Sequence, residues 1–211
     1  MYKRQHSSGE RIGFDQVRAT RGLENYDRTH FLRDYAEIVD ADNPLFGTSY
    51  VNTITNPSGP NTGSVLEMIT AKRMKELDHK IEAIGLDDFT NAELKKTGLF
   101  DVDALNEGKS FSRVDVSTDR YLIQDKRSFH RYEDDLGDDV AALDYLKIIR
   151  DNERLSKGRR YKFGYHEGQG GTGTLQVRYI ERLERLRKLH FPDFREFSID
   201  DFIRIDPPII E

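Results

Sequence analysis

Residues 111–126 read FSRVDVSTDRYLIQDK, and a sheet is easiest to infer from this part of the chain. Its apolar residues lie in two β-prone runs, which the polar residues 117–120 (STDR) separate. Two such runs joined by a short polar segment are typical of a β-hairpin. We therefore predict two antiparallel strands near the middle of the sequence.

Helices are predicted on both sides of this hairpin, because apolar residues there recur three and four positions apart. Two of the helices begin with a capping box, formed by Ser64 with Glu67 and by Thr90 with Glu93. The segment 64–99 therefore reads as a helical hairpin. The four longer predicted helices cover residues 28–39, 64–84, 138–155 and 174–190, and a short one covers 90–98.

Two other segments lack a helical period. Residues 160–165 read as a short strand. Residues 43–64, NPLFGTSYVNTITNPSGPNTGS, read as a loop of over twenty residues in which 50–54 form a candidate edge strand.

The predicted fold class is α+β, with about four helices, a small antiparallel sheet and long irregular loops or arms. We expect a single α+β domain over 28–190, an irregular N-terminal arm over 1–27 and an apolar C-terminal arm over 191–211. Residues 1–5, MYKRQ, could be encoded by the end of a transposon sequencing adapter, which leaves open whether they are native.

Composition excludes several classes of protein. The 211 residues include no cysteine, which removes disulfide scaffolds, thiolate metal sites and cysteine nucleophiles. No apolar run approaches the ~18 residues of a membrane span, and no signal peptide is recognisable. Charged residues make up 34% of the chain, with a net charge of −5. We expect no membrane partner and a cytoplasmic or virion location.

The hairpin carries one catalytic candidate. Asp115, followed by Gln124-Asp125-Lys126 on the next strand, resembles the core of the PD-(D/E)xK nuclease superfamily, and the flanking order of helix, hairpin, helix and strand also fits. The resemblance implies Mg²⁺-assisted phosphodiester cleavage, with Asp115 as a metal ligand and Lys126 positioning or activating the attacking water. Gln124 stands where the superfamily usually has a carboxylate.

A glycine-rich segment carries a second candidate. Gly168, Gly170 and Gly173, with Gly171 between them, follow a predicted strand and precede a predicted helix, which is the setting of a phosphate-binding loop. Asp40-Ala41-Asp42 resembles the Asp-x-Asp of metal-dependent glycosyltransferases. The two together suggest an enzyme that binds a nucleotide or nucleotide-sugar, although a flexible loop explains the glycines equally well.

The densest basic cluster alternates with aromatic residues. Arg159, Arg160 and Lys162 could contact the phosphates of a nucleic acid while the neighbouring rings stack on bases. On a strand, however, alternate residues face opposite sides. The aromatic residues would then face the core and the basic ones water.

The preferred hypothesis is a non-enzymatic structural or assembly subunit of the virion or scaffold type, without a cofactor. A thin core, a long loop and an apolar tail suggest segments that a protein partner or a second copy orders. The nuclease, with Mg²⁺, and the nucleotide-binding enzyme are the alternatives. Catalysis would be favoured if five side chains converged on one cavity, and assembly if they were dispersed over the surface. These side chains are Asp115, Gln124, Lys126, Glu67 and Glu76.

Overall fold

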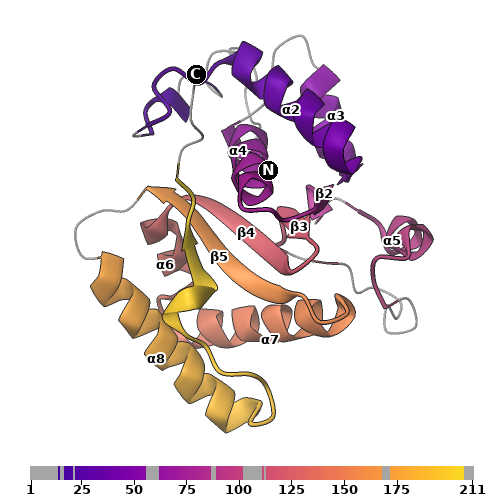
Figure 1. Cartoon of the computed structure of the whole chain (residues 1–211). Coiled ribbons are helices and arrows are strands. Elements are labelled where there is room, and N and C mark those ends of the chain that lie inside the picture. The colour runs from indigo at the N-terminus through magenta and orange to yellow at the C-terminus, as the bar shows by residue number, and fades with distance from the viewer. Residues whose placement is uncertain are drawn as a thin grey trace, which may run out of the picture.

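The computed structural model describes residues 14, 17–20, 22–55, 62–86, 89–101, 111, 113–167 and 172–206. Their regular elements follow one another in the order shown in Figure 1. In chain order these are α2 (Arg28–Asp42), β1 (Leu45–Phe46), α3 (Thr48–Thr55), α4 (Thr62–Glu76), β2 (Ile81–Ile84), α5 (Asn91–Thr97), β3 (Val116–Thr118), β4 (Tyr121–Ser128), the 3₁₀ helix η2 (Phe129–Tyr132), α6 (Glu133–Leu136), α7 (Asp139–Leu155), β5 (Arg160–Glu167), α8 (Thr172–His190), the 3₁₀ helix η3 (Ile199–Asp201) and β6 (Phe202–Arg204).

The predicted fold class is wrong. The described strands form one six-stranded mixed sheet in the order β1-β2-β3-β4-β5-β6, not a small antiparallel sheet, and seven α-helices accompany it. Strand β2 pairs antiparallel with β3 and β3 with β4, whereas β1–β2, β4–β5 and β5–β6 are parallel pairs. Parallel neighbours need a crossover connection. Helices α7 and α8 supply it for β4–β5 and β5–β6.

The hairpin and the helix after it are confirmed. Strands β3 and β4 pair antiparallel across the predicted turn, with Val116 opposite Ile123. Helix α7 begins where the sequence places it, because the Asp138 side chain accepts hydrogen bonds from the main-chain N–H groups of Val140 and Ala141. Local capping chemistry was enough to locate this boundary.

The region before the hairpin differs from the prediction. Helix α4 ends at Glu76, and Asp78 adopts a left-handed backbone with φ of 64° before strand β2. Ile81 and Ile84 lie three positions apart, a spacing that suits a helix, but both belong to strand β2. The segment 64–99 is therefore not a helical hairpin. The predicted loop 43–64 contains strand β1 and helix α3, and it continues into α4. The candidate edge strand over 50–54 is wrong, because these residues lie in α3.

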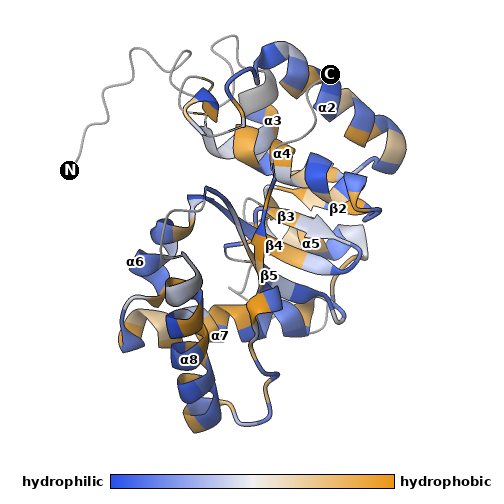
Figure 2. Cartoon of the chain, turned by 60° about the vertical axis from the view of Figure 1, so that its left-hand side comes forward, coloured by the Kyte–Doolittle hydropathy of each residue, from blue (hydrophilic) through white to orange (hydrophobic). Residues whose placement is uncertain are grey.

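The sheet lies between two helical layers (Figure 1). Helices α2, α3 and α4 cover one face, where Ile81, Val116 and Ile123 join a buried apolar cluster. Helices α6, α7 and α8 cover the other, where Leu122, Tyr161 and Phe163 join a second cluster. Figure 2 shows the apolar residues of β2, β3 and β4 between these layers. Within the described residues, no helix has the length and apolar character needed to cross a membrane.

Candidate active site

Asp115 lies just before β3 and is held by both neighbouring strands. Its main-chain N–H donates to the Ile123 carbonyl at 2.9 Å, and its own carbonyl accepts from the Gly85 N–H at 2.6 Å. Its carboxylate oxygen Oδ2 accepts the main-chain N–H of Asp125 at 2.5 Å. The Asp115 carboxylate is therefore fixed against β4, and the residue is only half-buried.

Gln124 and Lys126 project from the same face of β4, because side chains alternate along a strand. Gln124 is buried, and its Oε1 accepts a hydrogen bond from the Tyr161 hydroxyl at 3.3 Å. The Lys126 ammonium lies 5.8 Å from the centre of the Tyr132 ring. Both tyrosines belong to the apolar cluster under α6 and α7, so this face of β4 turns toward those helices.

Asp135 of α6 joins this group from outside the sequence motif. Its carboxylate lies 3.3 Å from the Lys126 ammonium and forms a second ion pair with Arg113. Burial lowers the pKa of Arg113, but the charge and hydrogen bond of Asp135 raise it further, so the net pKa lies above the ordinary value. Sequence reasoning missed Asp135 because it lies beyond the strand, in an acidic run that reads as a helix start.

Three buried tyrosines, Tyr132, Tyr145 and Tyr161, lie next to these polar groups. The Tyr132 hydroxyl lies 2.9 Å from the carbonyl oxygens of both Gln124 and Gly164, and the hydroxyls of Tyr145 and Tyr161 lie 2.9 Å apart. Burial raises the pKa of Tyr132 and Tyr161 well above the ordinary value, and the nearby Asp115 charge adds to the effect. These hydroxyls therefore stay protonated and act as fixed donors.

The opposite face of β4 carries a polar network that sequence reasoning also missed. The Asp125 carboxylate lies 2.8 Å from Nε2 of His166 on β5 and accepts the Thr70 hydroxyl of α4 at 2.9 Å. The side chains of His166 and Asp125 are 1% and 2% exposed. Parallel pairing of β4 with β5, which the sequence did not reveal, brings these residues together.

The basic residues of the predicted nucleic-acid-binding cluster form ion pairs and hydrogen bonds within the protein. Arg159 pairs with Glu82, Arg160 pairs with Asp201, and the Lys162 ammonium donates to the Asp200 carbonyl at 2.6 Å. Burial lowers the pKa of Lys162 despite the nearby Asp201. Tyr161, Phe163 and Tyr165 of β5 are buried in the core, as the alternating pattern predicts. The expectation that the basic residues face water is wrong for Arg159 and Lys162, which are buried as well because helices and loops cover both faces of the sheet.

The phosphate-loop candidate is described only in part. Gly168, Gly170 and Gly171 lie outside the described residues. Gly173 lies in the first turn of α8, where a Cβ would meet no atom within 4 Å. The loop remains a prediction.

The other acidic candidates belong to helices α2 and α4. Asp42 pairs with Lys75 at 2.6 Å and accepts the Ile81 main-chain N–H at 2.9 Å, at the end of α2. Glu76 pairs with Arg73 on α4. Glu67, also on α4, lies one turn before Thr70.

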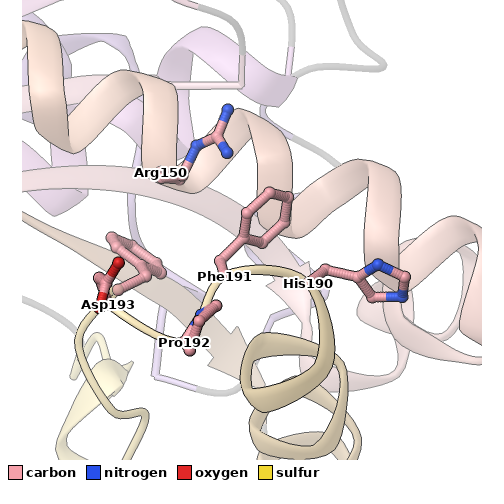
Figure 3. A pocket seen from close by; sticks show the side chains of 6 residues that line it. Arg150, His190, Phe191, Pro192 and Asp193 are labelled. Carbon is pink, nitrogen blue, oxygen red and sulfur yellow. The ribbon is translucent and has the colours of Figure 1, made fainter.

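Two cavities occur elsewhere in the described part of the molecule. One, of about 360 Å³, lies where α8 ends, and in it Arg150 lies over the Phe191 ring at 4.3 Å (Figure 3). The other, of about 150 Å³, lies beside β1 and β2. Neither is lined by Asp115, Gln124 or Lys126.

The described residues contain no group of three or more histidine and carboxylate side chains that could hold a metal ion. Asp115 and Gln124 together offer one carboxylate and one amide oxygen. Comparisons with protein-family models, with curated proteins and with solved structures gave no match.

Proposed function

We propose that this protein is a metal-dependent nuclease that uses Asp115, Gln124 and Lys126. The observation that carries the proposal is the position of Asp115, whose carboxylate lies against the main chain of β4 at Asp125, between Gln124 and Lys126. The three residues named by the sequence motif are thereby neighbours in the fold.

The element order supports the same proposal. The resemblance to the PD-(D/E)xK superfamily requires a helix, a hairpin, a second helix and a further strand. Here α4, the hairpin β3–β4, α7 and β5 follow in that order, and β5 pairs parallel with β4. Helices α4 and α7 lie on opposite faces of the sheet (Figure 1).

The residues present fit a weakly held Mg²⁺. Magnesium prefers oxygen ligands, and it is usually bound through one or two carboxylates together with waters and substrate phosphates. Asp115, whose Oδ2 accepts the Asp125 N–H, would supply the carboxylate, and Gln124, whose Oε1 faces the Tyr161 hydroxyl, would supply a neutral oxygen. When bound, Mg²⁺ would polarise the phosphate and promote ionisation of a water.

Lys126 would interact with the attacking water and with the phosphate of the substrate. The Lys126 side chain is 28% exposed, and its ammonium lies 3.3 Å from the Asp135 carboxylate. An ammonium in this position can orient a water and stabilise the charge that develops on the phosphate in the transition state. A polymeric substrate can reach the partly exposed Asp115 and Lys126 without an enclosed cavity.

The assembly function stays a second proposal. It was based on long segments that were predicted to lack regular structure, but part of the predicted loop 43–64 is helical. The large apolar side chains exposed in the described part of the chain are also distributed over several elements. They are Leu32, Val51, Leu77, Val140, Val177, Leu189 and Ile199.

Cleavage assays test the nuclease proposal. Supercoiled plasmid and short single-stranded and double-stranded oligonucleotides are incubated with the protein and Mg²⁺ or Mn²⁺. We expect cleavage that EDTA abolishes, and losses of about 100-fold or more for Asp115→Asn and Lys126→Gln, as for removal of one electrostatic catalytic group.

Matched controls use the same residue types on the outer side of α7. Asp144 and Lys147 form an exposed pair at 2.8 Å, so Asp144→Asn and Lys147→Gln should retain full activity. Absence of cleavage with either metal would refute the proposal. So would equal activity of Asp115→Asn and the wild-type protein. Light scattering on the same sample tests the assembly alternative.

A further inference from the structure

Asp125 connects the proposed metal ligand to a buried network on the other face of the sheet. Its main-chain N–H binds Asp115, while its side chain binds Thr70 of α4 and His166 of β5. One residue of β4 thus joins a half-exposed carboxylate to two other elements. The Thr70 hydroxyl also lies 3.4 Å from His166 Nε2, which closes the network.

We propose that His166 and Asp125 are positioning residues, which hold the Asp125 main chain in place so that its N–H orients the Asp115 carboxylate for a metal ion. This inference rests on the proposed function. Neither side chain would contact the metal ion or the phosphate, and both would act through the main chain of β4.

The composition of the network argues against a purely structural role. A buried carboxylate must be compensated by charge or hydrogen bonds, and a well-packed apolar group at the same place is often at least as stable. Here Asp125 Oδ1 and His166 Nδ1 are both buried without a hydrogen-bond partner. Polar networks that are only partly satisfied lower stability. A loss of stability of this kind is expected at a functional site, where the network fixes the orientation of a functional group.

Gly164 lets β5 lie close to β4 beside Asp125. Gly164 pairs with Asp125, and a Cβ at Gly164 would lie 3.0 Å from Ile123 Cγ2 and 3.1 Å from the Gln124 carbonyl oxygen, whereas its distance of 3.5 Å to Asp125 Oδ1 is an ordinary contact. The close pairing of the two strands brings His166 of β5 within hydrogen-bond distance of the Asp125 carboxylate.

Loss of His166 would leave Asp125 as a buried charge with one hydrogen bond fewer. The carboxylate would turn toward water, and the Asp125 N–H would move with it. Residues that hold metal ligands from behind typically change metal affinity or activity by 10–100-fold when they are removed. The same range is expected here.

The test measures Mn²⁺ affinity by calorimetry, beside the cleavage assay. His166→Leu removes the contact to Asp125, whereas the amide nitrogen of His166→Gln can occupy a position close to that of Nε2. We expect His166→Leu to weaken Mn²⁺ binding by about tenfold or more, and His166→Gln to restore most of the affinity. Cleavage should fall in parallel at low metal concentration and recover at high concentration.

A matched control separates positioning from general stability. Asp34 of α2 is a fully buried carboxylate that accepts the Tyr26 hydroxyl at 2.8 Å. Asp34→Asn should reduce stability without changing Mn²⁺ affinity. If His166→Leu does not fold, Thr70→Val takes its place, with an expected loss of about threefold to tenfold from removing one of the two hydrogen bonds to Asp125.

The outcomes distinguish the two proposals. A wild-type protein that neither binds Mn²⁺ nor cleaves nucleic acid refutes the proposed function itself. A wild-type protein that does both, with unchanged affinity in His166→Leu or in its substitute Thr70→Val, refutes only the positioning role. An equal loss of affinity in Asp34→Asn also refutes it, because the effect would then follow from stability alone.

Discussion

Arg159 and Glu82 form a buried ion pair that joins the start of β5 to β2. The Arg159 Nε donates to Glu82 Oε2 at 2.8 Å, and the two side chains are 9% and 11% exposed. The same guanidinium donates to the main-chain carbonyls of Thr118, Leu99 and Ser156. Arg159 therefore links strands and loops that are far apart in the sequence.

The first prediction concerns this pair. Arg159→Met should lower the free energy of unfolding by about 3 kcal/mol, because it leaves Glu82 as a buried charge without its partner. Urea unfolding measures the change. Since the guanidinium is saturated by internal acceptors, the substitution should leave the salt dependence of any nucleic-acid binding unchanged.

An exposed pair provides the comparison. Arg185 and Asp139 lie 2.6 Å apart, but their side chains are 57% and 51% exposed. Arg185→Met should therefore lower the free energy of unfolding far less than Arg159→Met does, because water screens an exposed pair. Equal costs for the two arginine variants would show that the Arg159 pair does not contribute as a buried pair.

Local chemistry accounts for the part of the fold that the sequence predicts. Asp138 caps α7 with its own side chain, and Thr90 and Glu93 form a capping box at α5, so both starts follow from a few adjacent residues. The turn of the central hairpin is local for the same reason. Parallel pairing is not local. No residue of β4 indicates that β5, thirty-odd positions later, will lie beside it.

The same difference between local and non-local contacts explains which residues of the candidate site were predicted. Asp115, Gln124 and Lys126 were recognised because a hairpin brings them together through short-range pairing. Asp135 and the contact of His166 with Asp125 were missed, because Asp135 reaches β4 from α6 and His166 reaches it from β5. Strand β2 was missed because four residues with Ile81 and Ile84 at its ends satisfy a helical period as well as a strand.

The second prediction restores the carboxylate that the superfamily usually has. Gln124→Glu adds a negative charge beside Asp115, which should strengthen the binding of a hard cation. We expect the Mg²⁺ concentration for half-maximal cleavage to fall by about tenfold, equivalent to ~1.4 kcal/mol. The Tyr161 hydroxyl lies 2.7 Å from the Arg113 carbonyl oxygen and 3.3 Å from Gln124 Oε1, and its single proton can turn from the carbonyl toward a carboxylate at position 124.

Calorimetry with Mn²⁺ provides a second measurement for Gln124→Glu. The control is Gln176→Glu on α8, where the side chain donates to the Tyr165 hydroxyl. That variant adds the same charge at another place. A gain in metal affinity that is equal in both variants would reflect net charge alone and would contradict the assignment of Gln124.

The third prediction compares two glycines. A Cβ at Gly164 would lie 3.0 Å from Ile123 Cγ2 and 3.1 Å from the Gln124 carbonyl oxygen, whereas a Cβ at Gly173 would meet nothing within 4 Å. Gly164→Ala should cost about 1–3 kcal/mol, as overpacking does. Gly173→Ala lies in helix α8 and should stabilise the protein by roughly 0.5–1 kcal/mol.

Thermal and urea unfolding of both alanine variants tests this contrast. Because Gly164 lies beside Asp125, we also expect Gly164→Ala to lower the Mn²⁺ affinity, whereas Gly173→Ala leaves it unchanged. Similar stabilities for the two variants would mean that β4 and β5 can separate freely at this point.

The last prediction concerns acid stability. Burial raises the pKa of Asp201, but hydrogen bonds from Arg160 and Ser198 and the charge of Arg195 lower it further, so its net pKa lies below the ordinary value. A carboxyl group with a depressed folded-state pKa stabilises the fold above its unfolded pKa, which is ~3.9 for aspartate. That contribution is lost as the pH falls through the folded-state value.

Asp201→Asn should therefore be less stable than the wild-type protein at neutral pH by about 3 kcal/mol, because Asp201 is fully buried and paired with two arginines. The difference should stay constant down to about pH 5 and shrink below about pH 4, where the wild-type carboxyl becomes protonated. Urea unfolding across this range measures it. A difference that widens on acidification would mean that the folded-state pKa of Asp201 is raised, and the arginines would then not compensate its burial.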